Sequence, residues 1–176
     1  IAQQERAAAR RELSRAITAF DALRQEFPSH PGYREGRAIA QLNLVPLLDG
    51  EAEPDEGARM LDEARTAYEA LAVQYPDRWQ YRQGAATALT QKALLRLREG
   101  RQALAEETMA EALRRQQRLA QTLPDQMEIQ SELGRAEQAA GEVLAAREDW
   151  EDAARHFQAA IDAQRIVVAE QPDQLA

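Results

Sequence analysis

Four prolines divide this chain into equal intervals, and their spacing constrains its fold more than any other feature. Pro28, Pro76, Pro124 and Pro172 recur at every 48th position. Aspartate follows the last three, and serine follows Pro28. Because self-similarity at a period of roughly 20–50 residues is typical of repeat architectures, this spacing predicts an array of equivalent structural repeats.

Other positions keep the same 48-residue register. An apolar residue stands five positions before each proline, an alanine stands twelve before, and a large apolar residue stands fifteen before. These residues are Leu23, Leu71, Leu119 and Val167; Ala16, Ala64, Ala112 and Ala160; and Leu13, Leu61, Met109 and Phe157. Chance does not keep so many positions at one unbroken period, so the repeat is predicted along the whole chain.

The composition indicates that the repeats are helical. Alanine accounts for 36 of the 176 residues, whereas Val, Ile and Thr together number 17. Alanine is the best helix former, and the other three favour strands. Aromatic residues make up 5% of the chain, so the core must be built from alanine and leucine with helices in close approach. We therefore expect an all-α fold.

Each full repeat is predicted to hold two helices, with breaks at residues 99–101 and 147–150. The seven predicted antiparallel helices cover residues 1–26, 31–45, 54–74, 79–98, 102–122, 127–147 and 151–170. They form one array over 1–176, with a half repeat at 1–27, full repeats at 28–75, 76–123 and 124–171, and the start of another at 172–176. Because the chain opens with Ile rather than Met, we expect it to be part of a longer protein.

Local signals place the helix ends. Asp77 and Asp125 each precede a Gln or Glu by three residues, which predicts a capping box. Ser29 is predicted to cap the equivalent helix in the first repeat. Gly100 suits a left-handed C-terminal cap. Pro46 removes a helical hydrogen bond and is expected to end the first helix of its repeat.

Composition excludes several functional classes. The chain has no cysteine, which excludes a disulfide scaffold, a thiolate zinc site and a cysteine nucleophile. The net charge of −8 and the isoelectric point near 4.9 disfavour nucleic-acid binding through a basic face. With a mean hydropathy of −0.62 and no long apolar run, we expect no membrane span.

Candidate chemical sites are sparse. His30 and His156 are the only histidines, and the acids near His156, Glu151 and Asp152, make a weak metal site. The acidic run at 49–56 lacks the order of a calcium loop, so we interpret it as a solvated loop. No serine has the surroundings of a nucleophile. We predict no catalytic, cofactor-binding or metal-binding residue, and therefore no cofactor.

Two tryptophans stand at predicted helix starts. Trp79 and Trp150 occur where a first and a second helix begin. We expect both to be packing plugs over the joints between repeats, with contact to a partner as the alternative.

The third repeat resembles the tetratricopeptide repeat. Its residues Ala140-Gly141, Leu144, Asp149 to Ala153, Phe157 and Ala160-Ile161 match the spacing of that family. The usual repeat is shorter, at about 34 residues. A 48-residue form resembles arrays carried beside serine/threonine protein kinases of planctomycete-like bacteria. The matching stretches are LAVQYPD at 71–77, LAQTLPD at 119–125 and VAEQPD at 168–173. No kinase motif is present in the chain.

The resemblance implies a right-handed solenoid with a groove lined by the first helix of each repeat. Transferred position by position, the groove residues are Ile39, Leu42, Thr87, Thr90, Leu94, Leu97, Arg98, Arg135, Gln138 and Glu142. The apolar members could line a groove for an amphipathic helix of a partner, or could belong to the core. The Lys/Asn set with which some members clamp a terminal carboxylate is absent.

These observations lead to two functional hypotheses. The first is a non-catalytic protein–protein interaction scaffold or sensor module in a larger signalling protein such as a serine/threonine kinase, with a protein or peptide partner. The alternative is a self-association module that oligomerises its parent chain. We expect a cytoplasmic location, and the sequence leaves an extracytoplasmic one open.

Overall fold

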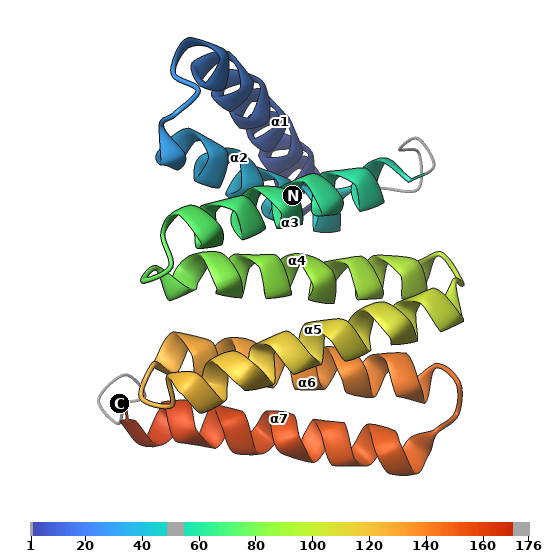
Figure 1. Ribbon diagram of the computed structural model, residues 1–176. Helices are drawn as coiled ribbons and strands as arrows, with labels where there is room; N and C mark the ends of the chain where they lie inside the picture. The colour runs from blue at the N-terminus through green and yellow to red at the C-terminus, as the bar shows by residue number, and fades with distance from the viewer. Residues whose placement is uncertain (1, 49–54, 171–176) are drawn as a thin grey trace. The chain divides into compact units, whose positions relative to one another are not determined.

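The computed structural model describes residues 2–48 and 55–170. In those ranges the chain forms seven α-helices, one 3-10 helix and no strand (Figure 1). The α-helices are α1 (Ala2–Glu26), α2 (Pro31–Leu44), α3 (Glu56–Gln74), α4 (Trp79–Arg98), α5 (Gln102–Thr122), α6 (Met127–Ala145) and α7 (Trp150–Glu170), and the 3-10 helix η1 is Val45–Leu47. The all-α prediction is confirmed, and each helix end lies close to its expected place.

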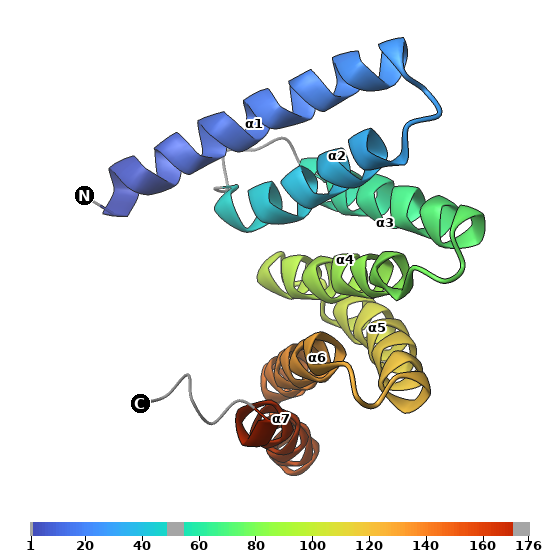
Figure 2. The same cartoon turned by 90° about the vertical axis from the view of Figure 1, so that its left-hand side faces the viewer.

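Neighbouring helices in the sequence pack against one another. In one compact unit, Ile1–Gln91, α2 packs against both α1 and α3. In the other, Lys92–Ala176, α6 packs against both α5 and α7 (Figures 1 and 2). We call these the N-terminal and C-terminal units. Their boundary falls inside α4, so the compact units do not follow the repeat boundaries at residues 76 and 124.

The turn around each of the first three prolines has the same hydrogen bonds in every copy. The residue before the proline donates its N–H to a carbonyl four residues earlier, and the residue two after the proline donates back across the turn. The first set joins Phe27 to Leu23, Tyr75 to Leu71 and Leu123 to Leu119 at 2.8, 2.8 and 2.9 Å. The second joins His30 to Phe27, Arg78 to Tyr75 and Gln126 to Leu123 at 3.1, 3.0 and 3.2 Å. The proline therefore occupies the second position of a β-turn, where its fixed φ is favoured.

A side chain closes each of these turns. The residue six positions after each proline donates a hydrogen bond to that proline's carbonyl oxygen. The pairs are Arg34 with Pro28, Arg82 with Pro76 and Gln130 with Pro124, at 2.8, 2.5 and 3.2 Å. The 48-residue period in the sequence is thus a period in the structure.

The predicted N-caps are wrong. Asp125 lies inside the turn, and the residue that caps α6 is Gln126, which makes no side-chain cap hydrogen bond. Likewise, the N-cap residue of α2 is His30 and not Ser29. Asp77 lies two residues before the first residue of α4. The β-turn uses the residue after each proline, so the helix begins beyond the position that a capping box requires.

The C-terminal cap of α4 is confirmed. Gly100 has a φ of 72° and donates its N–H to the carbonyl of Leu97, while Arg101 donates to Arg96. These two bonds form a Schellman motif. Glu148, at the equivalent position of the next repeat, has a φ of 67°, and the same pair of bonds follows α6. A glutamate there adopts a left-handed conformation that favours glycine.

Pro46 ends α2 as expected. The α-helix stops at Leu44, and Val45–Leu47 continue as the 3-10 helix with the proline in its first turn. The carbonyl oxygen of Pro46 accepts a hydrogen bond from the Arg6 guanidinium at 3.2 Å, which joins this segment to α1. Residues 49–54, with most of the acidic run, lie outside the described residues.

Glycines mark the closest helix approaches. A Cβ atom at Gly36 would overlap the ring of Phe20 on α1, and one at Gly84 would lie 2.6 Å from the ring of Tyr68 on α3. In the C-terminal unit, a Cβ at Gly141 would lie 2.5 Å from the Phe157 ring. Each glycine therefore lets an aromatic ring lie directly on the neighbouring helix backbone.

The tryptophans differ from the packing expected of them. Trp150, the first residue of α7, is 65% exposed, so its prediction as a packing plug is wrong. Trp79, the first residue of α4, is partly buried. An exposed ring at the first turn of a helix covers little of the neighbouring helix, and the α7 terminus is held by polar contacts instead.

Candidate interaction surfaces

The predicted groove residues are divided between the two compact units. Ile39, Leu42, Thr87 and Thr90 belong to the N-terminal unit, and Leu94, Leu97, Arg98, Arg135, Gln138 and Glu142 belong to the C-terminal unit. Leu42 and Thr90 are buried, and the hydroxyl of Thr90 donates to the carbonyl of Ala86 at 3.3 Å. These two side chains are therefore part of the packed interior.

The other groove positions differ in exposure. Ile39 is exposed on α2, and Arg98 is exposed at the end of α4. Thr87, Leu94 and Leu97 are half-buried. Of the apolar candidates, Ile39 thus presents the largest share of its side chain to a partner.

On α6 the three predicted residues form one exposed polar face. Arg135, Gln138 and Glu142 lie three and four residues apart, which places them on the same side of the helix. Arg135 pairs with Glu132 at 2.6 Å, and the Gln138 amide donates to the Glu142 carboxylate at 3.1 Å. This face offers a cation, an amide and a carboxylate to a polar partner.

A hollow of about 480 Å³ adjoins that face between α6 and α7. Its lining is mostly apolar and includes the side chain of Gln138. The lining residues are Gly134, Gln138, Ala160, Ile161, Gln164, Arg165 and Val168. The sequence prediction missed the α7 members. Their signal was the pair of apolar residues seven positions apart, Ile161 and Val168, which indicates one face of a helix.

A second hollow, of about 560 Å³, lies among α1, α2 and α3, and charged or polar residues make up most of its lining. Arg37 bridges it, because its guanidinium pairs with Asp21 on α1 at 2.7 Å and with Glu63 on α3 at 2.8 Å. The Gln41 amide nitrogen also donates to Glu63 at 2.8 Å. Gln41 is buried, and its Oε1 has no hydrogen-bond partner in the described part of the chain.

The C-terminal unit has a polar cluster at the same register. Glu137, two repeats after Gln41, is buried on α6. One oxygen of its carboxylate lies 2.6 Å from His156 Nδ1 on α7, and the other accepts a hydrogen bond from Gln117 on α5 at 3.2 Å. The partner of His156 is thus Glu137 on the neighbouring helix, and not the adjacent acids Glu151 and Asp152. The cluster joins all three helices.

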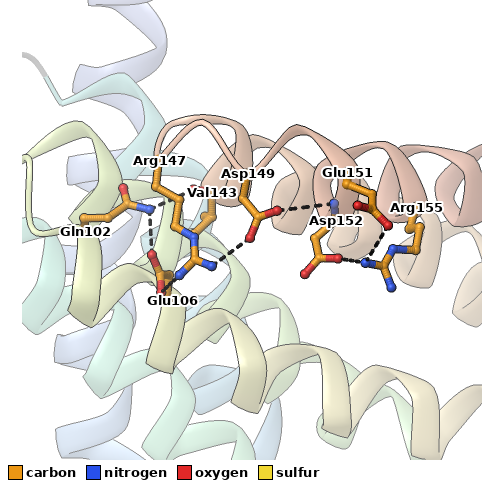
Figure 3. A network of polar contacts seen from close by, with 8 residues as sticks. All are labelled: Gln102, Glu106, Val143, Arg147, Asp149, Glu151, Asp152 and Arg155. Carbon is orange, nitrogen blue, oxygen red and sulfur yellow. Dashed lines mark hydrogen bonds and ion pairs between the residues drawn. The ribbon is translucent and has the colours of Figure 1, made fainter.

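A polar network holds the junction of α5, α6 and α7 (Figure 3). Gln102, the first residue of α5, donates to the carbonyl of Val143 at 2.8 Å and to Glu106 at 2.9 Å. Arg147 pairs with Glu106 at 3.1 Å and with Asp149 at 2.7 Å. The hydrogen bond to Asp149 is the first cause that raises the pKa of Arg147, followed by the Glu106 charge.

Asp149 also caps α7. Its Oδ1 accepts the backbone N–H of Asp152 at 3.5 Å, three residues into the helix (Figure 3). Arg155 pairs with Asp152 and, at 3.7 Å, with Glu151. The first turn of α7 is therefore acidic, which suits the positive end of the helix dipole. The network is structural, because its carboxylates are satisfied by cations and N–H groups from the same unit.

Two buried tyrosines lie near an acid in the N-terminal unit. The Tyr81 hydroxyl donates to Glu35 at 3.4 Å, and the Tyr68 ring is buried beside it on α3. Burial raises the pKa of Tyr68 far above its ordinary value of 10.0, and the charge of Glu35 adds to the effect. Burial and Glu35 raise the pKa of Tyr81 as well. Both hydroxyls therefore stay protonated at neutral pH.

Neither a metal-binding cluster nor a membrane span occurs in the described part of the chain. Across residues 2–48 and 55–170, no three His, Cys, Asp or Glu residues gather closely enough to hold a metal ion. Within the same ranges, no helix has both the length and the apolar composition needed to cross a membrane.

The other histidine of the chain, His30, makes a ring contact. It stacks on Tyr33, with ring centroids 4.3 Å apart.

No protein-family model, curated protein or solved structure matches this chain.

Proposed function

We propose that this chain is a non-catalytic protein–protein interaction module, a scaffold or sensor part of a larger signalling protein such as a serine/threonine kinase. The proposal includes a right-handed arrangement of the repeats, as the resemblance to the tetratricopeptide repeat implies. The repeated turns and the 48-residue period support the repeat class. The resemblance alone supports the association with a kinase.

One observation carries the interaction proposal. The α6 face of Arg135, Gln138 and Glu142 is exposed, polar and adjacent to the apolar hollow between α6 and α7. Apolar contact with a few convergent polar groups is the usual make-up of a peptide-binding surface. The polar residues would orient a bound segment, and the apolar hollow would supply the burial that gives affinity.

Affinity capture with a matched variant pair tests the proposal. The test variant is Arg135→Ala/Gln138→Ala/Glu142→Ala on α6. The control variant is Arg118→Ala/Gln121→Ala/Asp125→Ala, which removes nearly the same side chains at the same spacing from exposed positions at the end of α5 and in the turn after it. We expect a partner that the unaltered chain and the control retain, and that the α6 variant loses.

Two results would count against the proposal. Equal capture by both variants would show that the α6 face does not bind. A chain that retains no specific protein, but sediments as a dimer or larger oligomer, would favour the self-association alternative.

A further inference from the structure

The hollow among α1, α2 and α3 contains a cation that no described carboxylate neutralises. Arg34 lines this hollow and donates from its guanidinium to the carbonyl oxygen of Pro28 at 2.8 Å. Within residues 2–48 and 55–170 it forms no ion pair. Because a guanidinium has several N–H donors, most of the hydrogen-bonding capacity of this side chain is left for another acceptor.

The turn that Arg34 closes does not need its charge. In the third repeat, the neutral amide of Gln130 closes the equivalent turn by donating to the carbonyl oxygen of Pro124 at 3.2 Å. Arg82, at the same register of the second repeat, bonds the carbonyl of Pro76 but does not line the hollow. The positive charge of Arg34 therefore stands in the hollow without being required by the fold.

The other two arginines of the hollow break the pattern of the repeat. Both Arg24 and Arg37 line it. The residues one and two repeats later are Ala72 and Ala120 for Arg24, and Ala85 and Leu133 for Arg37. The array thus holds small or apolar side chains at these registers elsewhere, and cations only around this hollow. A local departure from a repeated pattern is where a function is expected.

The charges around the hollow leave a positive surplus. Arg24 and Arg37 share the carboxylate of Asp21 at 3.3 and 2.7 Å, and Arg37 also pairs with Glu63 at 2.8 Å. The remaining acid of the lining, Asp62, pairs with an arginine three residues later on α3 at 3.8 Å. With Arg34 included, three guanidiniums face two carboxylates, and one positive charge remains.

Small side chains leave space beside Arg34. Helices α2 and α3 run antiparallel, and Arg37 meets Glu63 between them (Figure 1). The α3 residues that follow Glu63 therefore lie toward Arg34, and those in the lining include Ala67 and Ala70. The volume of about 560 Å³ is in the range of small-molecule sites.

The described end of the acidic run does not reach this part of the hollow. Glu56 is the first residue of α3. Ala70 lies about 21 Å of helix rise further along the same helix. The charge of Arg34 therefore lacks an acid among the described residues.

We propose that this hollow binds a small organic carboxylate. The guanidinium of Arg34 pairs with the carboxylate, because its planar fork matches two carboxylate oxygens. The carbon chain of the ligand lies against Ala67 and Ala70, and a single negative charge balances the surplus. The inference goes beyond the proposed interaction function, because it concerns the N-terminal unit and needs no protein partner.

Butyrate and butyramide are the probes, because they have the same carbon chain and differ in charge. Each is titrated into the full chain labelled with nitrogen-15, and the backbone amides are followed by NMR. Butyrate should shift amides of α1, α2 and α3 saturably, with a Kd of about 1 mM or tighter. Butyramide should give no saturable shift.

Two matched variants test the role of Arg34. Arg34→Gln copies the residue that closes the third turn, so it removes the charge and keeps the hydrogen bond to the proline carbonyl. It should weaken butyrate binding by about tenfold or more. Arg82→Gln makes the same change outside the hollow and should stay within about twofold of the unaltered chain. Circular dichroism should show unchanged helix content in both.

A third variant tests the place of the carbon chain. Ala70 is exposed, and the residue two repeats later is Ile166, so a larger aliphatic side chain is tolerated at this register. Ala70→Leu fills the space beside Arg34 and should abolish saturable binding of butyrate while the helix content stays unchanged.

Four results would overturn the inference: no saturable shift with butyrate, an equal shift with butyramide, equal effects of Arg34→Gln and Arg82→Gln, or unchanged binding in Ala70→Leu. Inorganic phosphate that binds more tightly than butyrate would replace the carboxylate with a phosphate ligand. The α6 variant that tests the proposed function should bind butyrate normally, so either conclusion can fail without the other.

Discussion

The two compact units share their turns but place aromatic rings at different helix crossings. In the N-terminal unit, an aromatic ring on the second helix of one repeat covers a glycine on the first helix of the next repeat. Tyr68 on α3 covers Gly84 on α4 in this way. In the C-terminal unit the same register holds Gln116 and Glu132. The close approach has moved to the other crossing, where Phe157 covers Gly141 inside one repeat.

Residue sizes at that second crossing are complementary along the chain. The position equivalent to Gly141 holds Val45 in the first repeat, where it begins the 3-10 helix η1, and Ala93 in the second. The position equivalent to Phe157 on the second helix holds Leu61 in the first repeat and Met109 in the second. Interiors tolerate redistribution of volume provided that the total is kept. The repeats therefore share the backbone turn and a similar summed volume of side chains. The contact between a glycine and an aromatic ring can form at either helix crossing.

The largest expected effect on stability comes from a comparison of two leucines that occupy the same register, 48 residues apart. Leu61 on α3 is fully buried, whereas Leu13 on α1 is half-buried. Leu61→Ala should lower the free energy of unfolding by about 2–5 kcal/mol, the cost of a cavity in a packed core. Leu13→Ala should cost less than half of that. Urea unfolding of both variants measures the difference, and equal losses would mean that α1 is as tightly packed as α3.

The aromatic crossing gives the next effect. Gly84→Ala places a Cβ 2.6 Å from the Tyr68 ring. Overpacking should outweigh the gain in helix propensity of about 1 kcal/mol, for a net loss of about 1–2 kcal/mol. Glu132→Ala, at the same register of the C-terminal unit, should stay within about 0.5 kcal/mol. A stabilised Gly84→Ala protein in urea unfolding would show that the ring does not constrain this crossing.

The raised pKa of Tyr68 predicts a loss of stability in alkali. Above the ordinary value of 10.0, the unfolded chain releases a proton that the folded chain retains. The free energy of unfolding should therefore fall as pH rises, with about 1 kcal/mol of the loss due to Tyr68 between roughly pH 10 and 11. Tyr68→Phe keeps the ring and should reduce this slope, leaving the part due to Tyr81. An unchanged slope in urea unfolding across that range would contradict the prediction.

The smallest expected effects on stability concern the two left-handed helix caps, Gly100 and Glu148. Glu148→Gly should stabilise the protein by about 0.5–1 kcal/mol, because glycine adopts a positive φ without steric cost. Gly100→Ala should destabilise it by about 1 kcal/mol, although no atom lies within 4 Å of the added Cβ. Thermal unfolding measures both. Opposite signs are the expected result, and equal signs would show that conformation is not what distinguishes these caps.

The sequence predicted the helices well because their ends are set by local chemistry. The first three of the equally spaced prolines, together with Gly100 and Pro46, act within a few residues of themselves. The same local reasoning failed at Asp125 and Ser29, because the hydrogen-bonded turn after each proline takes up the residue that was expected to cap the helix.

The candidate site was harder to predict because exposure depends on neighbouring helices. Leu42 and Arg135 both occupy predicted groove positions, yet one is buried and the other exposed. Helical periodicity gives the angle of a side chain around its own helix, and a phase error of one residue exchanges core for surface. The α7 residues that line the hollow were missed for a different reason, because the resemblance assigns the groove to the first helix of each repeat.

By itself, the sequence determined the all-α class, the 48-residue period and the helix boundaries, since alanine content, proline spacing and turn residues act locally. Only the tertiary structure decided which equivalent residues are buried. Leu113 and Ile161 occupy one register, yet Leu113 is 9% exposed and Ile161 is 48% exposed. It also decided that Glu137 meets His156, because residues on two different helices come together only when α6 and α7 pack. Burial and pairing are properties of the assembled helices, and no single repeat specifies them.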